Sequence, residues 1–132
     1  IQAMNARYHK HIVTLEDPIE YELKSQECVI EQRELGVHMP SFASGLKHAL
    51  RQDPDIILVG EMRDLDTTAL AMAAAETGHL VLSTLHTCNA GQTVERIIDM
   101  YPAGQQNQVR SMLGNTLQAV LSQTLFSRVD RP

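Results

Sequence analysis

Apolar residues along the chain occur in two kinds of stretch, short unbroken runs and longer segments with helical spacing. The clearest run is residues 56–59, IILV, which lies between Pro54 and Gly60. A continuous apolar run bounded by such residues predicts a strand buried on both faces of a parallel sheet. Residues 11–15 and 79–85 contain similar runs, and we predict two further strands there.

The longer segments predict helices that alternate with these strands. Expected helices cover residues 41–52, 67–77, 89–100 and 105–125, and residues 1–8 read as the end of another. Ser41, Asp66 and Asn89 are the expected N-caps, and Gly78 is expected to end the second of these helices.

Residues 19–35 alternate loosely between apolar and polar positions, which predicts a hairpin or two short antiparallel strands. Elsewhere strands and helices alternate along the chain. That order predicts an α/β fold, with a mainly parallel sheet flanked by helices on both sides.

Length and composition fit a globular domain without a membrane span. A chain of 132 residues fits one domain and should bury roughly two-thirds of its unfolded surface. The apolar content of 43% and the charged content of 20% are ordinary. No apolar run approaches the roughly 20 residues that a transmembrane helix needs.

Charge and cysteine usage narrow the possible partners and the compartment. The net charge is -5, the isoelectric point is near 5.6, and Lys and Arg are scattered, which disfavours nucleic acid as the main ligand. Cys28 and Cys88 lie far apart without metal-ligand spacing, so we expect reduced thiols in a cytoplasmic protein.

Polar side chains follow three of the predicted strands. They are Glu16 and Asp17, Glu61, Arg63 and Asp64, and His86 and Thr87. The carboxyl ends of parallel strands meet at one edge of a sheet, so these groups are expected to converge there. A carboxylate at that edge could bind a magnesium-bound water or accept a proton from an attacking water. Solvated charged turns are the alternative interpretation.

Three long motifs resemble those of the secretion and pilus motor ATPases. VTLEDPIEY (residues 13–21) resembles their Asp box, DPDIILVGEMRD (53–64) their atypical Walker B motif, and ETGHLVLSTLHT (76–87) their His box. The sequence GEMRD, together with RIIDMYP (96–102) and LQAVLSQTL (117–125), resembles sequences of the PilT-like retraction ATPases of type IV pili. The pilus-assembly and type II secretion ATPases are close relatives of that group.

This resemblance implies a partial RecA-like P-loop NTPase domain over residues 1–132. It also implies a homo-hexamer with ATP and Mg²⁺ at the subunit interfaces, driving pilus retraction and twitching motility. The expected partner is an inner-membrane platform protein, and the expected location is the cytoplasmic face of the inner membrane.

The resemblance also assigns roles to particular residues. Glu61 would be the general base that orients the attacking water. Glu16 and Asp17 would act at Mg²⁺ and its waters, although Asp17 could equally cap local backbone. His86 would approach the γ-phosphate and report its loss.

Further contacts to nucleotide or to a neighbouring subunit are implied for five residues: Gly60, Arg63, Thr87, His79 and Arg33. For His79 a structural hydrogen bond at the start of a strand is the stronger alternative. Arg63 could instead pair with Asp64 or Asp66, and the role of Arg33 is open.

One element of the family pattern is absent from these residues. No stretch reads G-x-x-x-x-G-K-[ST], the loop that cradles the β- and γ-phosphates. We therefore expect a piece of a longer motor protein that lacks this loop, the N-terminal domain and the C-terminal tail, and that is inactive by itself. The alternative is a ring component that lost the loop and kept a scaffolding role.

Overall fold

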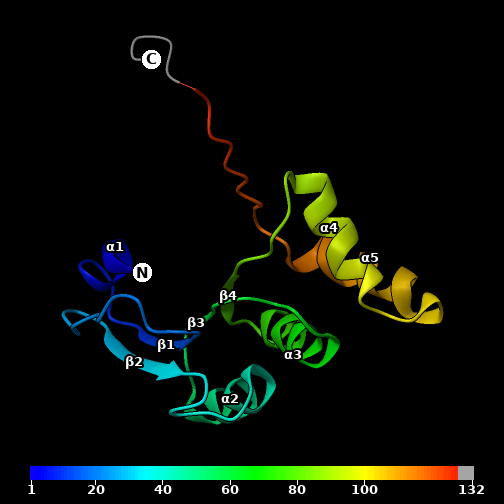
Figure 1. The fold of residues 1–132 in the computed structure, drawn as a ribbon. Coiled ribbons are helices and arrows are strands. Elements are labelled where there is room, and N and C mark those ends of the chain that lie inside the picture. Colours follow the sequence, from blue (N-terminus) through cyan, green and yellow to red (C-terminus); the bar gives the residue numbers. More distant parts are fainter. Residues whose placement is uncertain (128–132) are drawn as a thin grey trace. The chain divides into compact units, whose positions relative to one another are not determined.

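A computed structural model describes residues 1–127 of the chain (Figure 1). The chain forms two compact units, residues 1–85 and the part from His86 onward, which are described separately. In the described residues, helices are too short or too polar to cross a lipid bilayer.

The first unit is built on a sheet of four parallel strands in the order β2-β1-β3-β4. The strands are β1 (His11–Glu16), β2 (Val29–Glu34), β3 (Ile56–Val59) and β4 (Leu80–Ser83). Leu15 of β1 is level with Arg33 on one side and with Val59 on the other. The predicted α/β class with a parallel sheet is confirmed.

Helices cover both faces of this sheet (Figure 1). One face, with Leu15 and Ile57, packs against α2 (Phe42–Ala49) and α3 (Leu65–Glu76). The opposite face, with Ile12 and Ile56, packs against Cys28 and the short α1 (Gln2–Asn5). A 3₁₀ turn, η1 (Leu50–Gln52), extends α2. The alternation of inward positions along β1 therefore serves two cores, one on each face.

The caps of α2 and α3 follow local sequence chemistry, with one correction. Ser41 caps α2 as predicted, because its Oγ accepts a hydrogen bond from the Ser44 N–H at 3.1 Å. Asp66 was wrongly predicted to cap the next helix. Asp64 has the extended backbone that an N-cap needs, and its Oδ1 accepts from the Thr67 N–H at 2.8 Å.

The predicted hairpin over residues 19–35 is wrong. Residues 17–28 contain neither helix nor strand, and they carry the chain back so that β2 pairs with β1 in parallel. Asn5, which is fully buried, holds this connection. Its Nδ2 donates to the Lys24 carbonyl at 2.8 Å, and its Oδ1 accepts from the Gln26 N–H at 2.9 Å. The connection is thereby fixed on the face of the sheet that α1 covers.

The second unit contains α4 (Ala90–Asp99), the 3₁₀ turn η2 (Ala103–Gln105) and α5 (Gln106–Thr116). Asn89 caps α4 as predicted, since its Oδ1 accepts from the Gln92 N–H at 2.9 Å.

The last helix was wrongly predicted to reach Leu125. It ends at Thr116, and Leu117 already has an extended backbone. Leu121 and Leu125 are 97% and 91% exposed. Because isolated short helices are marginal in water, an apolar stripe without packing does not hold this segment helical.

Candidate functional site

The ends of β1 and β3 are held against each other at the carboxyl edge of the sheet. The Gly60 N–H donates to the Leu15 carbonyl at 2.7 Å, one step beyond the last paired residue of β3. A Cβ atom at Gly60 would lie 3.0 Å from that carbonyl oxygen and 3.5 Å from the Glu16 Cα. A side chain here would make the neighbouring backbone shift by a few tenths of an ångström, so glycine favours this close approach of the two strand ends that carry Glu16 and Glu61.

Glu16 is oriented by two hydrogen bonds to one of its carboxylate oxygens. Oε1 accepts from Thr14 Oγ1 at 2.6 Å and from Gln32 Nε2 at 3.0 Å. Oε2 accepts no hydrogen bond from the part of the chain that the structure describes. The carboxylate is therefore fixed through one oxygen while the other stays available, and Asp17 follows it as an exposed residue.

Glu61 is nearly buried, with 8% of the residue exposed. Its Oε2 lies 2.5 Å from Nε of Arg63, whose side chain is 68% exposed. Arg63 thus pairs with Glu61, whereas the Asp64 carboxylate is used to cap α3. The carboxylate expected to act as a base carries an exposed guanidinium beside it.

Thr84 joins the turn after β3 to the end of β4. Its Oγ1 donates to the Gly60 carbonyl at 2.5 Å, and its own carbonyl accepts from the Met62 N–H at 3.3 Å. Together these bonds fix the backbone on both sides of Glu61.

Arg33 and His79 are held by contacts away from Glu61. Arg33 Nη2 bonds to Gln52 Oε1 and lies 3.4 Å from Glu31 Oε2. His79 Nδ1 lies 2.9 Å from the Ala74 carbonyl oxygen, at the end of α3. His79 precedes β4, so it lies at the opposite edge of this parallel sheet from Glu61. These contacts favour the structural interpretation of His79.

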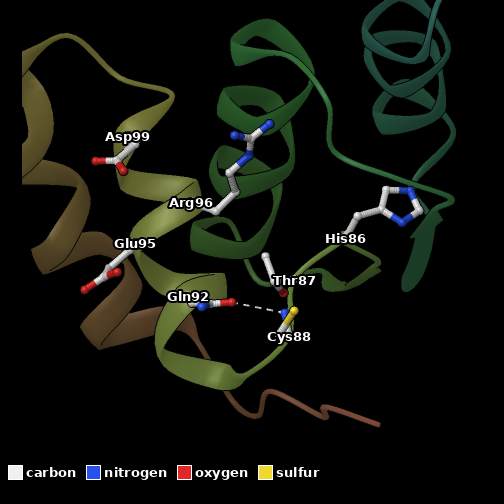
Figure 2. Close-up of a pocket in the computed structure, with 7 residues that line it drawn as sticks. All are labelled: His86, Thr87, Cys88, Gln92, Glu95, Arg96 and Asp99. Carbon is white, nitrogen blue, oxygen red and sulfur yellow. Dashed lines mark hydrogen bonds between the residues drawn. The ribbon is translucent and has the colours of Figure 1, made fainter. Parts of the chain in front are cut away.

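His86 and Thr87 line a pocket of about 270 Å³ in the second unit (Figure 2). The remaining lining residues are Cys88, Gln92, Glu95, Arg96 and Asp99. Thr87 Oγ1 lies 2.7 Å from Thr93 Oγ1, and the Cys88 N–H donates to Gln92 Oε1 at 3.2 Å. Thr87 and Cys88 are therefore fixed at the start of α4, in a pocket with acidic, basic and hydroxyl groups.

A comparison with protein families matches residues 1–131 to the model described as Type II/IV secretion system protein. The chain belongs to this family.

Relatives within the family include pilus motors. The chain is 54% identical to the type IV pilus retraction ATPase PilT of Pseudomonas aeruginosa, over 95% of this chain and 36% of the relative. It is 55% identical to a twitching motility protein of Neisseria gonorrhoeae, over 98% of this chain and 35% of the relative. The chain thus spans little more than a third of the length of these relatives.

A solved member of the family has a closely similar structure. The crystal structure of the pilus retraction motor PilT with bound ADP matches with a TM-score of 0.93 and 50% identity. The match covers 96% of this chain and 37% of that one.

Two supporting residues of this family member escaped the sequence reasoning. Gln32 orients Glu16 across neighbouring strands, and Thr84 fixes the Gly60 turn. Gln32 could have been found only from the parallel register of β1 and β2. The sequence analysis expected a hairpin there instead. Thr84 lies within the predicted strand over residues 79–85, two residues before His86, and directly follows β4.

Proposed function

We propose that the chain is part of an ATP-hydrolysing motor that retracts type IV pili and drives twitching motility. The observation that carries this proposal is the placement of Glu16 and Glu61 at the adjacent carboxyl ends of the paired parallel strands β1 and β3. Open α/β sheets bind ligands at this edge. The similarity to a retraction motor with bound ADP supports the same conclusion.

Glu61 has the role of general base in this proposal. Its carboxylate is nearly buried, and the backbone on either side of it is fixed by Thr84. It would orient a water and accept its proton as that water attacks the terminal phosphorus of ATP. Arg63 would stabilise negative charge on the phosphate oxygens, since its guanidinium is exposed beside this carboxylate.

The residues present also fit a magnesium ion held through water. Mg²⁺ in nucleotide sites keeps several waters and is held by one or two carboxylates together with phosphates. Glu16, with one oxygen fixed and Oε2 available, suits this arrangement, and Asp17 is the second candidate. When bound, the ion would neutralise charge on the phosphates.

Gly60 would present its backbone to the nucleotide, while His86 and Thr87 would approach the γ-phosphate and respond to its loss. Arg33 and His79 are assigned structural roles, because Arg33 bonds to Gln52 and His79 lies within hydrogen-bond distance of the Ala74 carbonyl. The phosphate loop would come from a part of the parent protein outside these residues, so the chain by itself should turn over little ATP.

The proposed assembly is a homo-hexamer with nucleotide between subunits, at the cytoplasmic face of the inner membrane. Its partner would be an inner-membrane platform protein of the pilus machinery. The names of the relatives, pilus retraction ATPase and twitching motility protein, support this setting.

Two other functions within the family compete with this proposal. An assembly or type II secretion ATPase would use the same site with the opposite output. A non-catalytic ring component would lack the phosphate-loop lysine in its full sequence.

The test combines enzymology with genetics. The purified full-length protein should hydrolyse ATP in a Mg²⁺-dependent manner, and absence of turnover would favour the ring component. Deleting the gene should leave pili on the cell surface and abolish twitching. Loss of surface pili would indicate an assembly motor, and retention of exported proteins a secretion motor.

A further inference from the structure

A groove runs between α2 and α3 on the surface of the first unit, with a volume of about 760 Å³. Its lining includes Ala69 and Leu70 from α3, and Lys47, His48 and Arg51 from α2 and η1. We call this surface the basic groove. Asp66 also lines it, so the lining carries two permanent positive charges against one negative charge.

The two permanent cations of the basic groove form no ion pairs within the described residues. Lys47, His48 and Arg51 are exposed. In the described residues no carboxylate lies within ion-pair distance of Lys47 or Arg51. A groove with unpaired cations on one wall and Ala69 and Leu70 on the other suits a segment that carries both carboxylates and an apolar group.

The same unit exposes such a segment in the connection between β1 and β2. Glu20 and Glu22 are exposed, and Tyr21 between them is 73% exposed. Neither carboxylate has a partner in the described residues. We call residues 20–22 the acidic segment.

The acidic segment and the basic groove belong to opposite faces of the sheet. The Tyr21 carbonyl accepts from Gln32 Nε2, and the Leu23 N–H donates to Gln32 Oε1. Gln32 is level with Thr14 on β1. Side chains alternate along a strand, so Thr14 points to the face opposite Val13 and Leu15, which pack against α2 and α3. The segment therefore lies on the side of α1, so it cannot reach the groove of its own chain.

The two surfaces also match in charge. Lys47 and Arg51 lie one helical turn apart, about 6–7 Å along the axis. Glu20 and Glu22 flank the bend at Tyr21, so the segment offers two carboxylates for the two cations and an aromatic side chain for the apolar wall.

We propose that the acidic segment of one copy of this chain docks in the basic groove of the next copy. This inference rests on the ring assembly proposed above. Such a contact joins two different surfaces, and heterologous contacts of this kind generate closed rings when the rotation between copies allows it. The contact adds a charge-specific link between subunits, made by the faces of the sheet.

A charge-swap experiment on the full-length protein tests this contact. One variant carries Lys47→Glu and Arg51→Glu, a second carries Glu20→Lys and Glu22→Lys, and a third combines all four changes. Self-association is measured by sedimentation velocity over a range of protein concentrations. The matched control, Arg7→Glu with Arg110→Glu, reverses two exposed cations outside the groove.

Each double reversal should weaken self-association about tenfold, because like charges then face each other, and the combined variant should return to within about twofold of the parent. The control should associate as the parent does. Unchanged association in both double reversals, or no recovery in the combined variant, would overturn the inference.

Binding to vesicles of phosphatidylglycerol is measured in parallel. If the groove reversal abolished vesicle binding and left self-association intact, the groove would be a membrane surface and the inference would be wrong. ATP hydrolysis is a separate readout. Normal turnover with unchanged association rejects only this contact, whereas absence of turnover in the parent protein rejects the proposed motor.

Discussion

Glu61 owes its position to interactions made by its neighbours. Gly60 is fixed to the Leu15 carbonyl and to Thr84, while Arg63 contacts the carboxylate itself. A group positioned in this way is organised before substrate arrives, which is what proton transfer from a bound water requires.

Replacing the carboxylate by an amide separates chemistry from binding. Glu61→Gln in the full-length protein should keep ATP affinity and lower kcat about 10²- to 10⁴-fold, because the amide cannot accept the proton. Steady-state hydrolysis and fluorescent-nucleotide binding measure the two effects. Glu76→Gln, an exposed acid at the end of α3, is the control and should leave kcat unchanged. Equal turnover in both variants would remove Glu61 from the role of base.

Gly60 provides a second prediction about a single residue. Gly60→Ala places a methyl group 3.0 Å from the Leu15 carbonyl oxygen, so the backbone where β1 and β3 meet must shift by a few tenths of an ångström. The variant should lose about 1–3 kcal/mol of unfolding free energy. Gly114→Ala, within α5 and with no atom within 4 Å of the added carbon, should be neutral or stabilising. Denaturant unfolding that ranked the two variants in the reverse order would contradict this account.

Sequence reasoning identified the acids of the carboxyl edge more reliably than their partners. Glu16 and Glu61 were found because each follows an apolar run, and that pattern is local. Arg63 had three acids within reach along the chain, and only the capping role of Asp64 and the burial of Glu61 select one of them. Such choices depend on side-chain geometry that spacing does not contain.

At the scale of elements, α3 shows how one residue sets a helix boundary. Asp64 accepts hydrogen bonds from both the backbone N–H and the hydroxyl of Thr67. The same boundary determines where the chain after Glu61 enters the helix. The cap therefore also fixes the backbone that follows Glu61 and Arg63.

Removing this cap should destabilise the fold measurably. Asp64→Ala should cost about 1 kcal/mol, because the first turn of α3 loses its side-chain acceptor. Asp66→Ala should stay within about 0.5 kcal/mol, as expected for an exposed position without such a bond. Urea unfolding monitored by circular dichroism gives both values. A larger loss of unfolding free energy in Asp66→Ala than in Asp64→Ala would favour Asp66 as the cap, as the sequence predicted.

The predictions of elements succeeded where the pattern was strong and local. The runs of β1, β3 and β4 and the caps Ser41 and Asn89 were confirmed. The hairpin failed because parallel pairing of β2 depends on Asn5, which holds residues 24–26 from a distance in the sequence. The prediction of a helix beyond Thr116 was wrong. The periodic pattern indicates an apolar face, but it does not show whether another surface packs against that face.

At the scale of the whole molecule, a pair of exposed charges links the starts of β1 and β3. Lys10 Nζ donates to Asp55 Oδ1 at 2.8 Å, and the His11 N–H donates to Asp55 Oδ2. The hydrogen bond from Lys10, followed by that from the His11 backbone, lowers the pKa of Asp55 from its ordinary 3.8. The hydrogen bond and charge of Asp55 in turn raise the pKa of Lys10.

These shifts predict how stability depends on pH. A carboxyl whose pKa is lower in the folded state stabilises the fold above its unfolded pKa, and the contribution disappears as pH falls through the folded value. A raised lysine pKa acts in the opposite sense, so its contribution disappears as pH rises through the raised value.

The difference in melting temperature between the parent protein and Asp55→Asn should therefore be present near neutral pH and vanish in strong acid. It should also be small and shrink with added salt, because both groups are exposed. Thermal unfolding from pH 2 to pH 8 measures it. A difference that grew as the pH fell would contradict the linkage.

The parallel order β2-β1-β3-β4 also has a consequence for how the protein is made. Strand β1 pairs with β3, and the bond from His11 to Asp55 spans 44 positions of the sequence. A ribosome adds about 5–20 residues per second, so the apolar run of β1 emerges seconds before its partner on that side exists. During synthesis this nascent strand is open to chaperones and proteases, and pauses in translation between β1 and β3 would lengthen that exposure.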